Sequence, residues 1–164
     1  MKKFLLKIIP FTFLFTSILS SQTNEIAQNS IHLELLGNGL IYSLNYERII
    51  AENFGARLGI GYWQVNESGG DNKATLMTVP VMVNYLLGSR SSKLELGIGI
   101  CYINYSEATE EFLGVDKSAT LGTATFAYRY QRPEGGVIFR AGVTPLFGSI
   151  GFQLWVGLGF GYAF

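Results

Sequence analysis

The chain has 164 residues, 48% of them hydrophobic, and its 12 basic residues balance its 12 acidic residues. This length suits a single domain, and the charge balance gives no sign of the clustered basic surface that nucleic-acid binding requires. The single cysteine, Cys101, excludes an internal disulfide framework and a CxxC metal or redox motif, and it lies too far from the N-terminus to be a lipid-modified first residue.

The first predicted element is a secretory signal peptide over residues 1–21. Lys2, Lys3 and Lys7 come before or at the start of an apolar run over 8–19, which ends in small and polar residues. A basic region, a short apolar region and a small-residue cleavage site are the parts of such a peptide. A retained N-terminal anchor is the alternative, but the run is shorter than the roughly 20 residues that span a bilayer as a helix.

Cleavage between Ser21 and Gln22 would remove three of the 12 basic residues and leave a short segment over 22–29 before a domain over 30–164. In this domain, short apolar segments alternate with turn-rich segments, and no stretch shows a persuasive 3.6-residue period. The pattern predicts an all-β domain. Eight strands are predicted, over 30–36, 40–50, 54–65, 74–87, 92–105, 118–132, 136–147 and 153–164.

The connections between these strands alternate in length. The Gly37-Asn38-Gly39 segment predicts a tight hairpin, and the connections over 51–53, 88–91 and 133–135 are also short. The connections over 66–73, 106–117 and 148–152 are longer. With both ends of the domain on one side, all the longer loops fall on the opposite side, as in outer-membrane barrels with short periplasmic turns and longer external loops. Only the first external turn, at Gly37-Asn38-Gly39, departs from this size pattern.

Each predicted strand has one apolar face, because successive side chains point to opposite sides. The fifth strand, for example, places Leu96, Ile98 and Ile100 on one face and Glu95 and Gly97 on the other. The second face is rich in glycine and holds no mid-strand lysine, which suits a crowded barrel interior rather than water. Aromatic residues near both ends of the apolar face predict two membrane interfaces. A soluble lipocalin-like barrel, with the apolar face inside, is the alternative.

Two features test the strand assignment. No residue from Ala141 to Phe164 is charged, but Pro145 and the repeated glycines disfavour a transmembrane helix there. Pro80 falls inside a predicted strand, where it removes a ladder hydrogen bond in a barrel that has no free edge. We therefore expect a β-bulge at Pro80 or a misplaced strand.

The C-terminal segment places Leu158, Phe160, Tyr162 and Phe164 at alternate positions up to the last residue. This pattern resembles the C-terminal targeting strand of outer-membrane β-barrel proteins, and the strand count and length resemble the small eight-stranded barrels of the OmpA-transmembrane and OmpX type. The resemblance implies a monomer in the bacterial outer membrane, in contact with its lipids and lipopolysaccharide. It also implies that periplasmic chaperones carry the chain and that the barrel-assembly machinery reads the last strand.

Six charged residues share the inward parity of their strands, three acids and three bases. We interpret them as a salt-bridge network that fills a narrow lumen, because an unpaired charge in a confined interior costs several kcal/mol. The alternative is a gated ion path lined by the same side chains. The six residues are Glu34, Glu47, Arg57, Glu95, Arg129 and Arg140.

No catalytic, cofactor or metal site is predicted. His32 could act as the base of a lipid-modifying enzyme with Ser43 as nucleophile and Glu34 or Glu47 as orienter, but its inward parity turns it away from the lipid chains. An acidic loop is interpreted as solvated rather than as a divalent-ion site, since its spacing matches no calcium loop. Its acids are Glu107, Glu110, Glu111 and Asp116.

The sequence thus predicts a non-enzymatic outer-membrane barrel with a structural or surface-interaction role. The alternatives are a narrow porin-like channel for ions or small solutes, a lipid-modifying enzyme and a soluble ligand-binding barrel.

Overall fold

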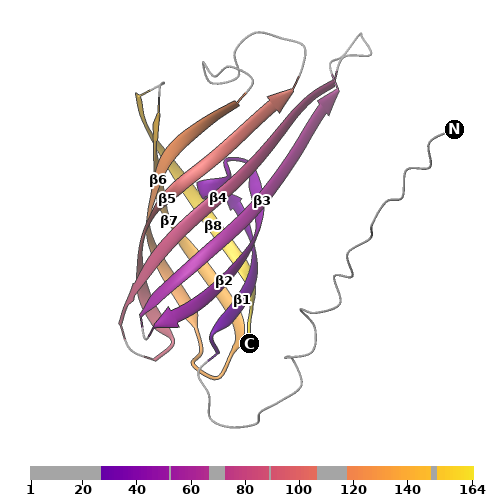
Figure 1. The fold of residues 1–164 in the computed structure, drawn as a ribbon. Coiled ribbons are helices and arrows are strands. Elements are labelled where there is room, and N and C mark those ends of the chain that lie inside the picture. Colours follow the sequence, from indigo (N-terminus) through magenta and orange to yellow (C-terminus); the bar gives the residue numbers. More distant parts are fainter. Residues whose placement is uncertain (1–26, 52, 67–72, 89, 107–117, 149–150) are drawn as a thin grey trace, which may run out of the picture.

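A computed structural model describes residues 27–51, 53–66, 73–88, 90–106, 118–148 and 151–164. Eight strands and one short 3-10 turn, η2, make up this part of the chain (Figure 1). In chain order they are β1 (Asn29–Leu36), η2 (Gly37–Gly39), β2 (Tyr42–Ala51), β3 (Phe54–Asn66), β4 (Lys73–Leu87), β5 (Ser92–Ser106), β6 (Ser118–Gln131), β7 (Gly136–Gly148) and β8 (Gly151–Ala163).

The strands form one closed barrel in which each strand pairs with the next along the chain. Every pairing is antiparallel, and β1 closes the barrel against β8. The closure reaches the last residue, because Asn29 and Phe164 exchange two backbone hydrogen bonds, of 2.9 and 2.8 Å. This architecture confirms the predicted eight-stranded antiparallel up-and-down barrel.

The barrel has two distinct ends (Figure 1). The hairpins β2–β3, β4–β5 and β6–β7 close at the end that holds the C-terminus, which we call the C-terminal end. The hairpins β3–β4, β5–β6 and β7–β8 close at the opposite end, which we call the loop end. The predicted arrangement of short and long connections agrees with these ends. The predicted signal peptide and the acidic loop over 107–117 lie outside the described residues.

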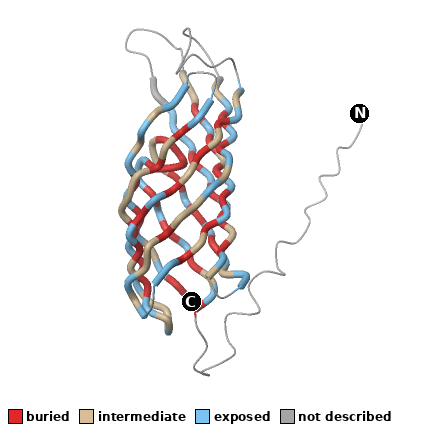
Figure 2. Tube along the Cα trace, turned by 90° about the vertical axis from the view of Figure 1, so that its left-hand side faces the viewer, coloured by how far each residue is buried: buried red, intermediate tan, exposed pale blue. Residues whose placement is uncertain are grey.

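Side chains alternate between the two faces of the barrel wall, as the alternation of buried and exposed segments in Figure 2 shows. On β5, Ile98 and Ile100 are 72% and 51% exposed on the outside, whereas Glu95 and Cys101 are fully buried on the inside. The outer wall is therefore mainly apolar, and the six charged residues of inward parity are internal. This is the reverse of a soluble barrel, which hides its apolar face.

Pro80 does not produce the expected bulge or end the strand. β4 runs through it, and Pro80 pairs with Cys101 of β5. On its other side, the β3–β4 ladder is interrupted between the pairs Leu58–Val81 and Gly61–Thr78 without a change of register. A Cβ added to Gly59 would lie 2.8 Å from Pro80 Cγ, so glycine at this position makes room for the ring. The ladder loses pairs locally and the strand stays in place.

The β1–β2 turn is the second departure from the prediction. The two strands form the expected hairpin, but β2 begins at Tyr42, and Gly37–Gly39 fold into the lumen rather than forming an external turn. Gly37, Asn38 and Gly39 are all buried, and η2 contacts the strands β1, β2, β3, β4, β6, β7 and β8. We call Gly37–Gly39 the turn plug.

The described residues contain no helix that is long and apolar enough to cross a membrane.

Candidate functional site

The inward side of the barrel wall brings all six predicted charged residues into one connected chain of ion pairs, which we call the charged cluster. Arg129 lies between Glu47 (2.5 Å) and Glu95 (3.3 Å). Arg140 lies between Glu95 and Glu34, and the Arg140–Glu34 distance is 3.4 Å. The chain of alternating charges ends at Arg57, 3.5 Å from Glu34.

Glu95 is the centre of the charged cluster. Arg140 donates to both of its oxygens, from Nε at 2.8 Å and from Nη2, which is the bidentate geometry that gives the strongest ion pairs. Arg129 contacts the same carboxylate, and all three side chains are 0–3% exposed. Three acids and three guanidinium groups therefore balance one another in charge in a buried interior, where any unpaired member would be costly.

Neutral side chains and glycines complete the packing of the charged cluster. Asn84 donates to Glu47 Oε1 at 2.7 Å, and Gln131 Oε1 accepts two hydrogen bonds from Arg129. β8 contributes Gly159 opposite the large Arg140 side chain, where an added Cβ would lie 3.3 Å from Arg140 Cβ. The absence of side chains on this part of β8 gives the guanidinium groups their space.

The turn plug covers the loop-end side of the charged cluster. Asn38 is fully buried, accepts a hydrogen bond from Arg57 Nη2 at 2.6 Å and donates to Thr123 Oγ1 at 2.7 Å. Thr125 also donates to Asn38 Oδ1, at 3.0 Å, and Thr78 donates to Gly39 O, at 3.0 Å. The turn is thus held from strands on several sides of the lumen.

Beyond the turn plug, the lumen is apolar. A buried cluster at the loop end packs with Ile41 and Trp155 at its margin. Sequence reasoning missed this feature, although a signal existed, because these residues share the inward parity that was interpreted as polar. We call this set the apolar cluster: Leu40, Leu76, Cys101, Ile103, Leu121 and Leu146.

The residues considered for catalysis are not arranged for it. His32 is buried and its Nε2 lies 3.0 Å from Arg140 Nη1, while Ser43 Oγ accepts from Asn45 at 2.9 Å. None of the described hydrogen bonds joins His32 to Ser43, and across β1–β2 the residue opposite His32 is Asn45. A nucleophile and base in contact, which acyl transfer needs, are therefore not brought together here.

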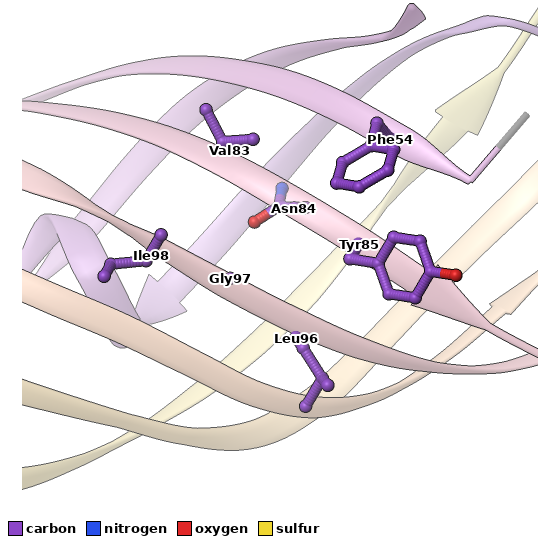
Figure 3. Close-up of a pocket in the computed structure, with 7 residues that line it drawn as sticks. All are labelled: Phe54, Val83, Asn84, Tyr85, Leu96, Gly97 and Ile98. Atoms are coloured by element: carbon purple, nitrogen blue, oxygen red, sulfur yellow. The ribbon is translucent and has the colours of Figure 1, made fainter. Parts of the chain in front are cut away.

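Among the described residues, no group of three His, Cys, Asp or Glu side chains is arranged to hold a metal ion. Cys101 is buried in the apolar cluster, as expected for a small side chain. A shallow groove of about 250 Å³ lies on the outer wall rather than in the lumen (Figure 3). Phe54, Tyr85 and Ile98 line it on the outward parity of β3, β4 and β5, so the groove belongs to the apolar outer wall.

These features define a class: a small closed barrel with an apolar outside and a lumen that holds the charged cluster, the turn plug and the apolar cluster. Comparison with solved structures agrees. The N-terminal β-barrel domain of Pseudomonas aeruginosa OprF superposes with a TM-score of 0.58 at 17% sequence identity, covering 84% of this chain and 98% of that chain.

Ail, the attachment invasion locus protein of Yersinia pestis, has the same fold. Its complex with the heparin analogue sucrose octasulfate matches with a TM-score of 0.51 at 13% identity, over 84% of this chain and 98% of that one. Its structure as an outer membrane protein in a bilayer nanodisc matches with a TM-score of 0.50 at 13% identity, over 84% and 99%. No protein-family model and no curated protein sequence matches the chain. The chain therefore has the fold of small eight-stranded outer-membrane barrels.

Proposed function

We propose that this protein is an integral outer-membrane barrel with a non-enzymatic role, in membrane integrity or in surface interaction through its loop end. The observation that carries the proposal is the inverted wall: Phe160 and Tyr162 are 64% and 60% exposed outside, while Arg129 and Glu95 are fully buried inside. Lipid is the solvent that suits such an exterior. By this proposal the C-terminal end faces the periplasm and the loop end faces outward.

We propose the same partners that the sequence predicts. The exposed outward row of Leu158, Phe160, Tyr162 and Phe164 supports contact with lipid and reading by the barrel-assembly machinery during insertion. We do not propose for this chain the sulfated ligand of the Ail complex, because four of the residues between Ser106 and Ser118 are acidic, which disfavours a polyanion.

Insertion is tested by extraction and by gel mobility. The mature chain should stay with the membrane in alkali or urea, and its mobility should shift on heating, because a folded barrel resists the detergent until it is boiled. Release into the aqueous fraction, or a chain that stays folded in plain buffer, would contradict a lipid-facing exterior.

Closure of the lumen is tested by conductance in planar bilayers. The charged cluster and the turn plug fill the cross-section, so the native protein should show no steady conductance, while Glu95→Ala should produce openings by freeing two guanidinium groups. A steady native conductance that Glu95→Ala and Arg57→Ala leave unchanged would show that ions bypass the charged cluster and would favour the porin-like alternative.

The non-enzymatic assignment has its own test. Since His32 contacts Arg140 rather than a nucleophile, His32→Ala should leave the lipid composition of the host membrane unchanged. A lost lipid modification in this variant would contradict the assignment.

A further inference from the structure

The shallow groove on the outer wall lies between two rows of side chains that cross β3, β4 and β5 (Figure 3). Asn84 and Gly97 pair with each other between the rows and form its floor. We call this space the outer-wall groove, and its side walls are aliphatic and aromatic. The row nearer the C-terminal end is Phe54, Tyr85 and Leu96, with the first two rings 4.7 Å apart, and the other row includes Val83 and Ile98.

The second of these rows continues to an arginine on β2. Arg48 pairs with Ala56, which pairs with Val83, which in turn pairs with Ile98. The row climbs from the rim into the wall, since Arg48 lies three residues before the end of β2 and Ile98 lies six residues after the start of β5. Between Arg48 and the outer-wall groove, this row carries only the methyl group of Ala56.

Arg48 is an exposed charge on a mainly apolar wall, flanked along β2 by the exposed Tyr46 and Ile50. Within the part of the chain that the structure describes, its side chain has no ion-pair or hydrogen-bond partner. A guanidinium group on the lipid-facing side of a barrel is destabilising, and least so near the membrane interface. Phosphate is an anion that matches its planar donors. Arg48 therefore offers a phosphate-binding group at the rim end of an apolar path.

The other exposed charges at the C-terminal end add to this preference. Arg90 in the β4–β5 turn and Arg132 after β6 are both exposed, and among the described residues at this end Glu134 is the exposed acid. A surplus of arginines beside a bilayer attracts anionic headgroups more strongly than zwitterionic ones.

We propose that Arg48 and the outer-wall groove together bind an anionic phospholipid of the leaflet at the C-terminal end. Its phosphate pairs with Arg48, and one acyl chain passes over Ala56 into the groove. The inference rests on the proposed membrane placement. The volume of about 250 Å³ is below the roughly 300–1,000 Å³ of pockets that enclose small molecules, and it suits part of one chain. The headgroup site and the groove also follow each other from the rim toward the bilayer core, as the parts of a lipid do.

The test uses brominated lipids as contact quenchers of a tryptophan in the groove. The reporter protein carries Trp63→Phe, Trp155→Phe and Phe54→Trp, so that its single indole lines the groove. The reference protein carries Leu158→Trp in place of Phe54→Trp, on the outward face of β8 between the apolar Leu35 and Ala141. In phosphatidylcholine vesicles, brominated phosphatidylglycerol should bind at the reporter about fivefold more tightly than brominated phosphatidylcholine, the factor expected for one arginine beside an anionic lipid. The reference should show no such preference.

Three further substitutions in the reporter separate the parts of the site. Arg48→Gln should abolish the preference, whereas Arg132→Gln, at another exposed arginine of the same end, should keep it. Ala56→Phe retains Arg48 but fills the path to the groove, so it should also abolish the preference.

Equal binding of the two lipids at the reporter would overturn the proposal. A preference that survives Arg48→Gln or Ala56→Phe, or that Arg132→Gln also removes, would overturn it too, because the selectivity would then come from diffuse charge. Failure of both lipids to quench the reporter and the reference would overturn the membrane placement itself, so the two failures are distinguishable.

Discussion

The two halves of the lumen are filled by opposite means. Toward the C-terminal end, six charges are joined in one chain of ion pairs, centred on Glu95. Toward the loop end, the apolar cluster fills the same narrow cross-section by shape alone. The turn plug lies between the halves and contacts both, since Asn38 bonds to Arg57 on one side and Leu40 belongs to the apolar cluster on the other. The lumen of a small barrel can thus be closed by ion pairs or by apolar packing, and substitutions in the two halves should destabilise the protein by different amounts.

The largest effect is expected in the charged half. Glu95→Gln removes the carboxylate that two buried guanidinium groups share, and it should lower the free energy of unfolding by about 3–5 kcal/mol. Urea unfolding of the protein in lipid vesicles, followed by gel mobility, measures this loss. Glu134→Gln, at the exposed β6–β7 turn, is the matched control and should stay within about 0.5 kcal/mol of the native protein. A similar small loss at Glu95 would show that water, not Arg129 and Arg140, solvates its carboxylate.

A smaller effect is expected in the apolar half. Leu121 is 1% exposed, so Leu121→Ala should leave a cavity and lower the free energy of unfolding by about 2–3 kcal/mol. Leu58→Ala removes the same atoms from the outer wall, where the side chain is 55% exposed and lipid chains can occupy the vacated space. The same urea titration compares the two. Equal losses would mean that the loop-end lumen is as fluid as the lipid around the barrel, and the contrast between the halves would disappear.

The fold could be predicted from the sequence because it depends on local signals. Period-two alternation and turn residues located all eight strands to within a few residues, and parity put the six charges inside. The pairing inside the lumen could not be predicted, because most of its ion pairs join strands that are not neighbours in the sheet. Arg129 lies directly opposite Arg140 across β6–β7, an arrangement of like charges that is unfavourable by itself. Glu95, from β5, compensates both charges: it lies diagonally from Arg129 on the neighbouring strand β6 and contacts Arg140 on β7, and this second contact depends on barrel size and shear.

The turn plug shows the same limit in another way. A Gly-Asn-Gly segment between two strands predicts a hairpin turn, and nothing local distinguishes an external turn from an inserted one. Its partners Arg57, Thr123 and Thr125 are 19 to 87 positions away in the chain. The apolar cluster, in contrast, could have been predicted from the sequence, since Leu76, Leu121 and Leu146 are apolar residues at inward positions of strands whose other inward residues are mostly polar or small.

The smallest effect is expected at Gly37 of the turn plug. Comparing Gly37 with Gly151 separates the cost of backbone strain from the cost of a side-chain clash. Gly37 and Gly151 both have positive φ, +71° and +87°, so alanine is strained at each position. An added Cβ would lie 2.5 Å from Glu34 Cδ at Gly37, whereas nothing lies within 4 Å at Gly151. Gly37→Ala should therefore lower the free energy of unfolding by about 1 kcal/mol more than Gly151→Ala does. This is near the low end for overpacking, because the Glu34 carboxylate can shift.

That shift would be transmitted to the charged half, since Glu34 also pairs with Arg57 and Arg140. The double variant Gly37→Ala, Glu95→Gln should then lose an amount of unfolding free energy that differs from the sum of the two single losses, as expected for groups in one network. Strict additivity, measured by the same urea titration, would mean that the turn plug can move away from Glu34 without disturbing the ion pairs. The two halves of the lumen would in that case be closed independently.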